Sequence, residues 1–195
     1  HEHQSTAVHL QGIRQGTQPR FGDQDRARLQ VLQITQEGKP SIAMHAEAGT
    51  IGHRGINSAG MGVCINYIRS EIDAFRPGLS FLIKLRGVLN SSRMSHALKM
   101  LMTYVGPNSM NMIIAQQGGE IVDVENLPND LLFVYPQDGI VTHANHFESP
   151  MLRVRDTGKS TLPDTIYRSR RLRRLLEARR GRLNVETIRE ALTDH

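Results

Sequence analysis

The distribution of hydrophobic and polar positions predicts that the chain begins with β-sheet. Short apolar runs at 29–35 and 41–47 flank a turn at 37–39, an arrangement typical of a β-hairpin. A glycine-rich turn at 55–62 then leads into a third apolar run at 63–68. We therefore expect these three runs to form strands.

Two helices are predicted next. Leucines recur on one helical face over 79–89. A second stripe, at helical spacing, consists of Met94, Ala97, Leu98, Leu101 and Val105. Both stripes are expected to face a core.

The second half of the chain repeats this order. Further strands are expected at 110–116, 120–125, 131–135 and 140–144. Glycines between them favour tight turns. A basic helix from Pro163 to about Arg180 follows, and Asn184 is expected to cap a last helix. The order strands, helices, strands, helices fits an α+β fold with an antiparallel sheet better than alternating βαβ units.

Residues 1–28 differ from the rest of the chain. They carry five glutamines and few apolar positions, without a helical or strand period. We expect an irregular or disordered leader here, and one domain over 29–195.

Composition excludes several classes of protein. With 195 residues, of which 38% are hydrophobic, the chain can bury a core without metals or cross-links. Its single cysteine, Cys64, excludes a scaffold held by internal disulfides. No apolar run approaches the ~18 residues that cross a bilayer, so we expect a cytoplasmic protein without a membrane partner.

The positive charge is local. The formal net charge is +5, and eight of the 24 lysines and arginines lie between Arg168 and Arg182. Aromatic residues make up 5% of the chain, which leaves few platforms for stacking bases. We therefore expect no nucleic-acid partner and a basic helix whose arginines are solvated. Its packed face is expected to consist of Ile166, Leu172, Leu175 and Leu176.

Common phosphate, nucleophile and metal motifs are missing. Neither G-x-G-x-x-G, nor G-x-x-x-x-G-K-[ST], nor G-x-S-x-G occurs. His143 and His146 are closely spaced, but they follow a predicted strand rather than sharing a helical face, and zinc needs three or four ligands. We expect no metal and no cofactor.

One cysteine and three asparagines are the remaining candidates for chemistry. Cys64 lies within a predicted strand without a neighbouring cation, and we interpret it as a small buried hydrophobe rather than a nucleophile. Asn66 and Asn145 each end an apolar run, where a carboxamide could donate to an oxyanion. For these two and for Asn57, a turn or cap role is the alternative.

Three segments together carry a family resemblance. They are EAGTIG at 47–52, GINSAGMGVCIN at 55–66 and GIVTHANHF at 139–147. In this order they resemble the penicillin acyltransferase family, also called the isopenicillin N acyltransferase family, of cysteine N-terminal-nucleophile hydrolases. The T-H-x-N-H-F string is the most specific part, and the resemblance runs from about Leu29 to the end of the chain.

The resemblance implies a four-layer αββα sandwich, here incomplete. It also implies amide hydrolysis or acyl transfer by an N-terminal cysteine whose own α-amino group is the base. Asn145 and Asn66 would be catalytic residues near the oxyanion, and His143, His146 and Asn57 would bind substrate. The partner would be a small-molecule amide or acyl-thioester.

The sequence departs from that family at its first residue, which is His1 rather than cysteine. Two hypotheses follow. The chain is a fragment of an N-terminal-nucleophile acyltransferase or amidohydrolase without its nucleophile, or it is a non-catalytic binding or interaction module on the same scaffold. In either case we expect residues 1–195 alone to have little amidase or acyl-transfer activity.

Overall fold

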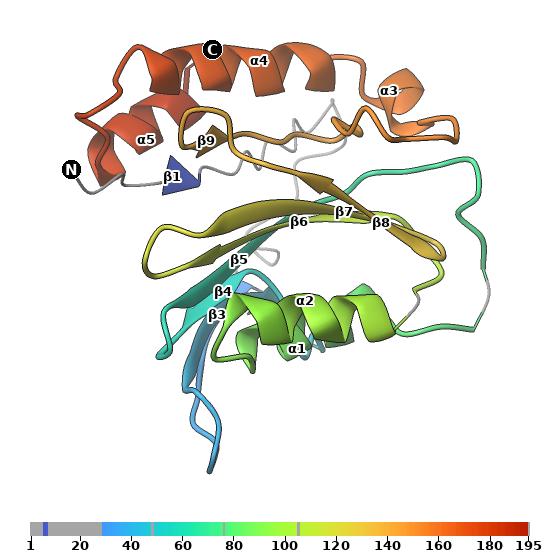
Figure 1. Ribbon diagram of the computed structural model, residues 1–195, viewed down its shortest axis with the longest axis vertical. Coiled ribbons are helices and arrows are strands. Elements are labelled where there is room, and N and C mark those ends of the chain that lie inside the picture. Colours follow the sequence, from blue (N-terminus) through green and yellow to red (C-terminus); the bar gives the residue numbers. More distant parts are fainter. Residues whose placement is uncertain (1–5, 8–28, 48, 76, 105, 195) are drawn as a thin grey trace.

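The computed structural model describes residues 6–7, 29–47, 49–75, 77–104 and 106–194. Its centre is a seven-stranded sheet in which each strand pairs antiparallel with its neighbours in sequence (Figure 1). The strands are β2 (Leu29–Ile34), β3 (Ile42–Glu47), β4 (Gly55–Asn57), β5 (Met61–Asn66), β6 (Met110–Gln116), β7 (Ile121–Leu127) and β8 (Asp130–Val134). The sheet is therefore a meander.

Tight turns set the register of this meander. Gly38, between β2 and β3, has a φ of 67°, and Gly118, between β6 and β7, has a φ of 113°. Glycine adopts such values without the steric cost that a side chain would add. The β6–β7 turn brings Ala115 opposite Ile121, which fixes which residues of β7 point to each face.

Two helices cover one face of the sheet. These are α1 (Phe81–Leu89) and α2 (Met94–Thr103) (Figure 1). The main hydrophobic core lies between them and the strands. It includes Leu85, Val88, Leu89, Ala97, Leu101, Met112, Ile114 and Val124. Both predicted helical stripes therefore face the core, except that α2 ends at Thr103 and Val105 lies outside the described residues.

The opposite face carries a smaller β layer and a second helical layer. Strand β1 (Thr6–Ala7) pairs in parallel with β9 (Ile140–Val141). Outside them lie α4 (Thr165–Glu177) and α5 (Val185–Leu192) (Figure 1). The short helix α3 (Gly158–Thr161) precedes α4. The layers follow the order α, β, β, α, and this confirms the expected α+β fold with αββα layering.

The packing of α4 corrects part of the prediction for the basic helix. Leu172 and Leu176 are fully buried, as expected. Ile166 is 40% exposed instead, because the buried stripe continues from these leucines to Ser169 and Thr165 and leaves Ile166 to one side. Its arginines are also not all solvated. Arg173, for example, donates to the carbonyl oxygen of Ile140 at 3.2 Å.

Three predicted boundaries differ from the structure. The turn expected at 55–62 contains a strand of its own, β4. The strand expected at 140–144 ends at Val141, so the T-H-x-N-H-F string lies in an irregular segment. Within the expected leader 1–28, Thr6–Ala7 form β1, and the other positions lie outside the described residues. Among the helices of the described part, none has the length and apolar character needed to cross a membrane.

Candidate functional site

The two asparagines predicted near an oxyanion meet where the end of β5, which holds Asn66, contacts the irregular segment after β9, which holds Asn145. Asn66 is the last residue of β5 and donates from Nδ2 to the carbonyl oxygen of His143 at 2.9 Å. The carbonyl oxygen of the next residue, Tyr67, accepts from Nδ2 of Asn145 at 2.9 Å. The fold therefore joins segments 77 and 78 positions apart in sequence and brings both asparagines to the same place.

Helix α4 contacts the oxygen of the Asn145 carboxamide, whereas Tyr67 contacts its nitrogen. Nη2 of Arg168 donates to Asn145 Oδ1 at 2.9 Å, and Nε of Arg168 donates to Asp164 Oδ2 at 2.8 Å. The backbone N–H of Asn145 donates to Thr165 Oγ1 at 2.5 Å. The direction of this amide is thus fixed by residues of α4 and its start, which the sequence pattern did not indicate.

The two asparagines differ in what they can offer to a ligand. Asn66 is 4% exposed, and its Nδ2 points at the His143 backbone. Asn145 is half-buried, and a carboxamide nitrogen carries two hydrogens. Tyr67 accepts one of them, and among the described residues the other has no acceptor. Asn145 is therefore the better placed donor.

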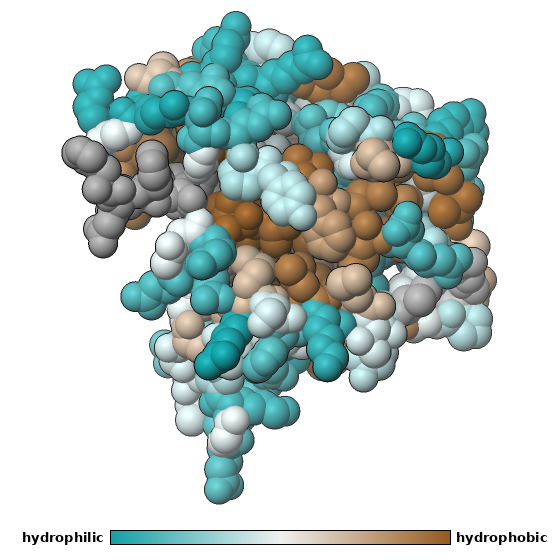
Figure 2. Space-filling model, in the orientation of Figure 1, coloured by the Kyte–Doolittle hydropathy of each residue, from teal (hydrophilic) through white to brown (hydrophobic). Residues whose placement is uncertain are grey.

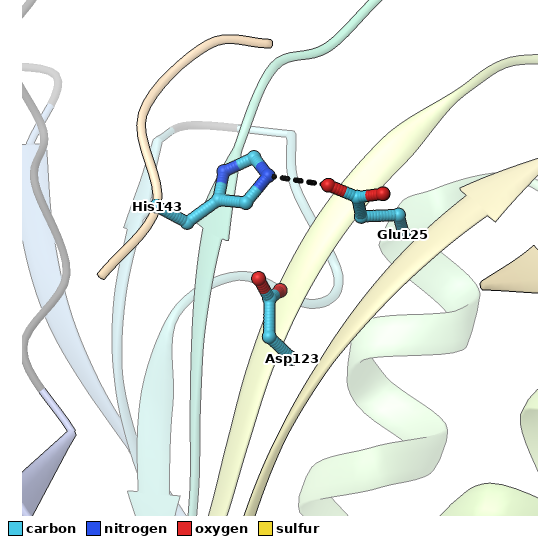
Figure 3. A group of neighbouring side chains, drawn as sticks. All are labelled: Asp123, Glu125 and His143. Carbon is cyan, nitrogen blue, oxygen red and sulfur yellow. Dashed lines mark hydrogen bonds and ion pairs between the residues drawn. The ribbon is translucent and has the colours of Figure 1, made fainter. Parts of the chain in front are cut away.

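His143 is fully buried and pairs with Glu125, which lies on β7 (Figure 3). Its Nε2 lies 3.1 Å from Glu125 Oε1, and its Nδ1 lies 2.7 Å from the carbonyl oxygen of Ala144. Both acceptors need a hydrogen on the ring nitrogen that faces them. The imidazole therefore carries two protons and a positive charge.

Glu125 also anchors the backbone beyond His143. Its Oε1 accepts from the N–H of Glu148 at 2.5 Å, and its Oε2 accepts from the N–H of Ser149 at 3.2 Å. One buried carboxylate thus fixes both ends of the segment 143–149. This segment contains Asn145, so Glu125 positions Asn145 without contacting it.

Asp123 completes a buried charged cluster with Glu125 and His143 (Figure 3). One ligand atom from each lies within 4.8 Å of the others, a spacing that could suit a metal ion. A metal needs a neutral imidazole nitrogen, whereas both His143 nitrogens face acceptors. Asn111, on the neighbouring strand, donates to Asp123 Oδ1. We interpret the cluster as a buried ion-pair network rather than a metal centre.

The members of this cluster shift one another's pKa. Burial alone would lower the pKa of His143, but the charge of Asp123 and the hydrogen bond and charge of Glu125 outweigh it and raise the pKa to about 9. Burial raises the pKa of Asp123 to about 7, against the opposing charge of His143. His143 is therefore protonated at neutral pH.

His146 belongs to a second, adjoining network. Its Nδ1 lies 3.0 Å from Thr165 Oγ1, and its Nε2 lies 3.1 Å from Glu148 Oε1. Ser169 donates to the same Glu148 oxygen at 2.6 Å. Burial would raise the pKa of Glu148, but the hydrogen bonds from His146 and Ser169 lower it to about 2. Glu148 is thus a carboxylate that ties the segment to α4.

Asn57 lies apart from these residues. Its Nδ2 donates to the carbonyl oxygens of Leu89 and Ser91, each at 2.8 Å. Its Oδ1 accepts from the N–H groups of Ala59 and Met61. All four partners are backbone groups, so here the structure shows an Asx-type turn that joins the β4–β5 turn to the end of α1.

Cys64 has a neighbouring cation, Arg54, which the sequence did not lead us to expect, but its thiol is not activated. Burial raises its pKa, and the charge of Arg54 opposes this effect only in part. The side chain is partly buried in β5, opposite Ile113 of β6. A thiol whose protonated form is favoured is a poor nucleophile.

Sequence reasoning did not identify Asp123, Glu125, Glu148 and Arg168. A signal existed for the first two, because β7 reads I-V-D-V-E-N-L and places two acids on one face of a largely apolar strand. No comparable signal marked Arg168, one of eight basic residues between positions 168 and 182.

Comparison with known proteins adds a family context. The family model described as acyl-coenzyme A:6-aminopenicillanic acid acyl-transferase matches residues 22–195. The 40 kDa form of acyl-coenzyme A:6-aminopenicillanic-acid-acyltransferase from Emericella nidulans is 34% identical over 137 residues, which cover 69% of this chain and 38% of the relative. Penicillin V acylase from Agrobacterium tumefaciens aligns with a TM-score of 0.48 and 12% identity, over 79% of this chain and 55% of that structure. The chain thus spans 38% of the length of its curated relative.

Proposed function

Since the chain belongs to the acyl-coenzyme A:6-aminopenicillanic acid acyl-transferase family, we propose that the protein transfers an acyl group or hydrolyses an amide. We further propose that its nucleophile is not Cys64 and comes from a segment outside residues 1–195. The raised pKa of Cys64 and its place within β5 argue against Cys64 as the nucleophile. The substrate class is a small N-acyl amide or acyl-thioester.

The observation that carries the proposal is the fixed, half-buried carboxamide of Asn145. In acyl transfer, negative charge develops on the carbonyl oxygen of the tetrahedral intermediate, and preorganised N–H donors stabilise it. The guanidinium of Arg168 bonds to Asn145 Oδ1 at 2.9 Å and draws electron density from the amide. This makes the free N–H of Asn145 a stronger donor in a fixed direction.

The other candidates are proposed to position rather than to touch the substrate. His143 and Asn66 are both buried, and their contacts hold the backbone on the N-terminal side of Asn145. His146 is held by α4 and by Glu148. Asn57 is proposed to maintain the turn before β5.

The test uses the protein expressed from its complete gene and a panel of N-acyl amides and acyl-thioesters. Asn145→Ala is expected to lower kcat by about 10²- to 10³-fold, with a smaller effect on KM, because the lost contact strengthens in the transition state. The matched control is Asn108→Ala, an exposed asparagine in the loop before β6, which should leave both constants unchanged. Cys64→Ser should retain turnover.

Two outcomes would overturn the proposal. If Cys64→Ser abolished turnover, the cysteine of β5 would be the nucleophile. If the complete gene product bound the amides but turned over none, the chain would be a binding module on this scaffold, the second hypothesis.

A further inference from the structure

A cavity of about 180 Å³ lies between α1, α2 and the edge strand β8. Apolar side chains form much of its wall, among them Leu101, Leu131 and Phe133. Hydrophobic residues also gather across the middle of the molecular face shown in Figure 2, over the strands between the two helical layers. The wall of the cavity is therefore partly apolar.

A buried charged side chain also forms part of this wall. Lys84, on α1, is 2% exposed, and its Nζ donates to Asn126 Oδ1 at 2.5 Å. Asn126 is itself 2% exposed, and its Nδ2 donates to the carbonyl oxygens of Asn108 and Leu127. The amide is therefore oriented with its oxygen toward the ammonium group.

This ammonium group lacks a counter-charge. It carries three hydrogens, of which Asn126 accepts one. Among the described residues, no carboxylate lies within ion-pair distance of Nζ. Asp130 also lines the cavity, but it is exposed, and its Oδ1 accepts from the N–H of Leu131. Burying an unpaired cation is costly, and a bound anion would offset that cost.

We propose that this cavity binds a small monocarboxylate with an apolar tail, whose carboxylate pairs with Lys84 and whose tail packs on Leu101, Leu131 and Phe133. The volume suits a tail of about five to seven carbon atoms, well below a drug-sized ligand. The bound carboxylate supplies the counter-charge that the buried Lys84 lacks. A free inorganic anion would fit less well, because it has no apolar part to pack on the apolar wall.

The proposed carboxylate site lies on the other side of the sheet from Asn145. Glu125 and Asn126 are consecutive in β7, so their side chains point to opposite faces. Glu125 reaches His143, and Asn126 reaches Lys84. The carboxylate site and the acyl-transfer site are therefore independent, and failure of one has no bearing on the other.

The chemistry also predicts how binding depends on pH. Burial lowers the pKa of Lys84 to about 8, so the lysine is mostly charged at pH 7 and loses its charge not far above that. Affinity for the carboxylate should fall as the pH rises through about 8 to 9.

The experiment measures binding of sodium hexanoate to the purified protein by calorimetry, with hexanamide, acetate and inorganic phosphate as comparison probes. Hexanoate should bind at least tenfold more tightly than hexanamide, which lacks the charge, and than acetate, which lacks the tail. Lys84→Met should abolish hexanoate binding. Lys99→Met, an exposed lysine on α2, should leave it unchanged.

Equal binding of hexanoate and hexanamide, or unchanged binding to Lys84→Met, would overturn the proposal. So would phosphate binding as tight as that of hexanoate, which would indicate an anion site without use of the apolar wall. The comparison of probes on the unaltered protein tests the proposal even if Lys84→Met does not fold.

Discussion

At the scale of single residues, the buried His143 and Asp123 and the partly buried Glu148 determine how stability responds to pH near Asn145. The pKa of His143 is raised from 6.5 to about 9, so its contribution to stability is complete below pH 6.5 and is lost as the pH rises through about 9. The pKa of Asp123 is also raised, and its contribution falls between pH 3.8 and about 7. The lowered pKa of Glu148 acts in the opposite direction, and its contribution is lost as the pH falls from 4.5 toward about 2.

We therefore predict that the free energy of unfolding decreases from about pH 6 to about pH 8, measured by urea denaturation at each pH. Above about pH 8 the lowered pKa of Lys84 opposes this trend, because the cost of burying its charge is lost as the lysine deprotonates. His143→Gln should flatten this dependence and destabilise the protein by roughly 3–5 kcal/mol, because Glu125 would be left buried and unpaired. His96→Gln, at an exposed position of α2, is the control and should change neither quantity. A stability that rises across this pH window would contradict the assignment of His143 as a buried cation.

At the scale of elements, α4 serves two purposes. Its C-terminal half packs Leu172 and Leu176 against Ile140 and Ala191. Its N-terminal half presents polar groups to the segment that contains Asn145. The docking of one half therefore sets the position of the other.

This arrangement predicts that two side-chain truncations on the same helix reduce the free energy of unfolding by different amounts. Leu176→Ala should destabilise the protein by about 2–5 kcal/mol, since Leu176 is 0% exposed and its removal leaves a cavity. Ile166→Ala should cost less than about 1 kcal/mol, because Ile166 is 40% exposed. Urea denaturation of both variants tests this, and equal costs would show that α4 is rotated relative to the structure.

At the scale of the whole molecule, less of the net charge of +5 is available to bind an anionic partner than the sequence suggests. Most of the basic cluster around α4 is engaged in ion pairs. These pairs are Arg168–Asp164, Arg171–Asp194, Arg173–Glu177, Arg179–Glu190 and Arg180–Asp138. Such pairs add little stability at an exposed surface, but they neutralise the local field.

We predict weak binding to duplex DNA, with a slope of log affinity against log salt smaller in magnitude than about 2, since each neutralised phosphate contributes about 0.9. Fluorescence anisotropy across a salt series measures the slope. A variant with Asp164→Asn, Glu177→Gln and Asp194→Asn releases three arginines and should steepen it. A slope as steep as about 6 for the unaltered protein would instead indicate a true nucleic-acid interface.

The sequence by itself determined the elements and the family of this protein. Local periodicity placed β2, β3, β6–β8, α1 and α2 within a few residues, because alternation and helical stripes are properties of neighbouring positions. The T-H-x-N-H-F string indicated the family that the family model then matched. This string contains Asn145, and the segment GINSAGMGVCIN at 55–66 ends with Asn66, which the fold brings next to it.

The tertiary structure alone decided the partners of those residues. Glu125 meets His143 through the packing of β7 under the segment after β9, and Arg168 reaches Asn145 because Leu172 and Leu176 dock α4. In the sequence, Lys84 is likewise an ordinary polar position of a predicted helix. Only the packing of α1 on the sheet buries it. Such contacts depend on how distant surfaces pack, and packing leaves no local period in the chain from which they could be predicted.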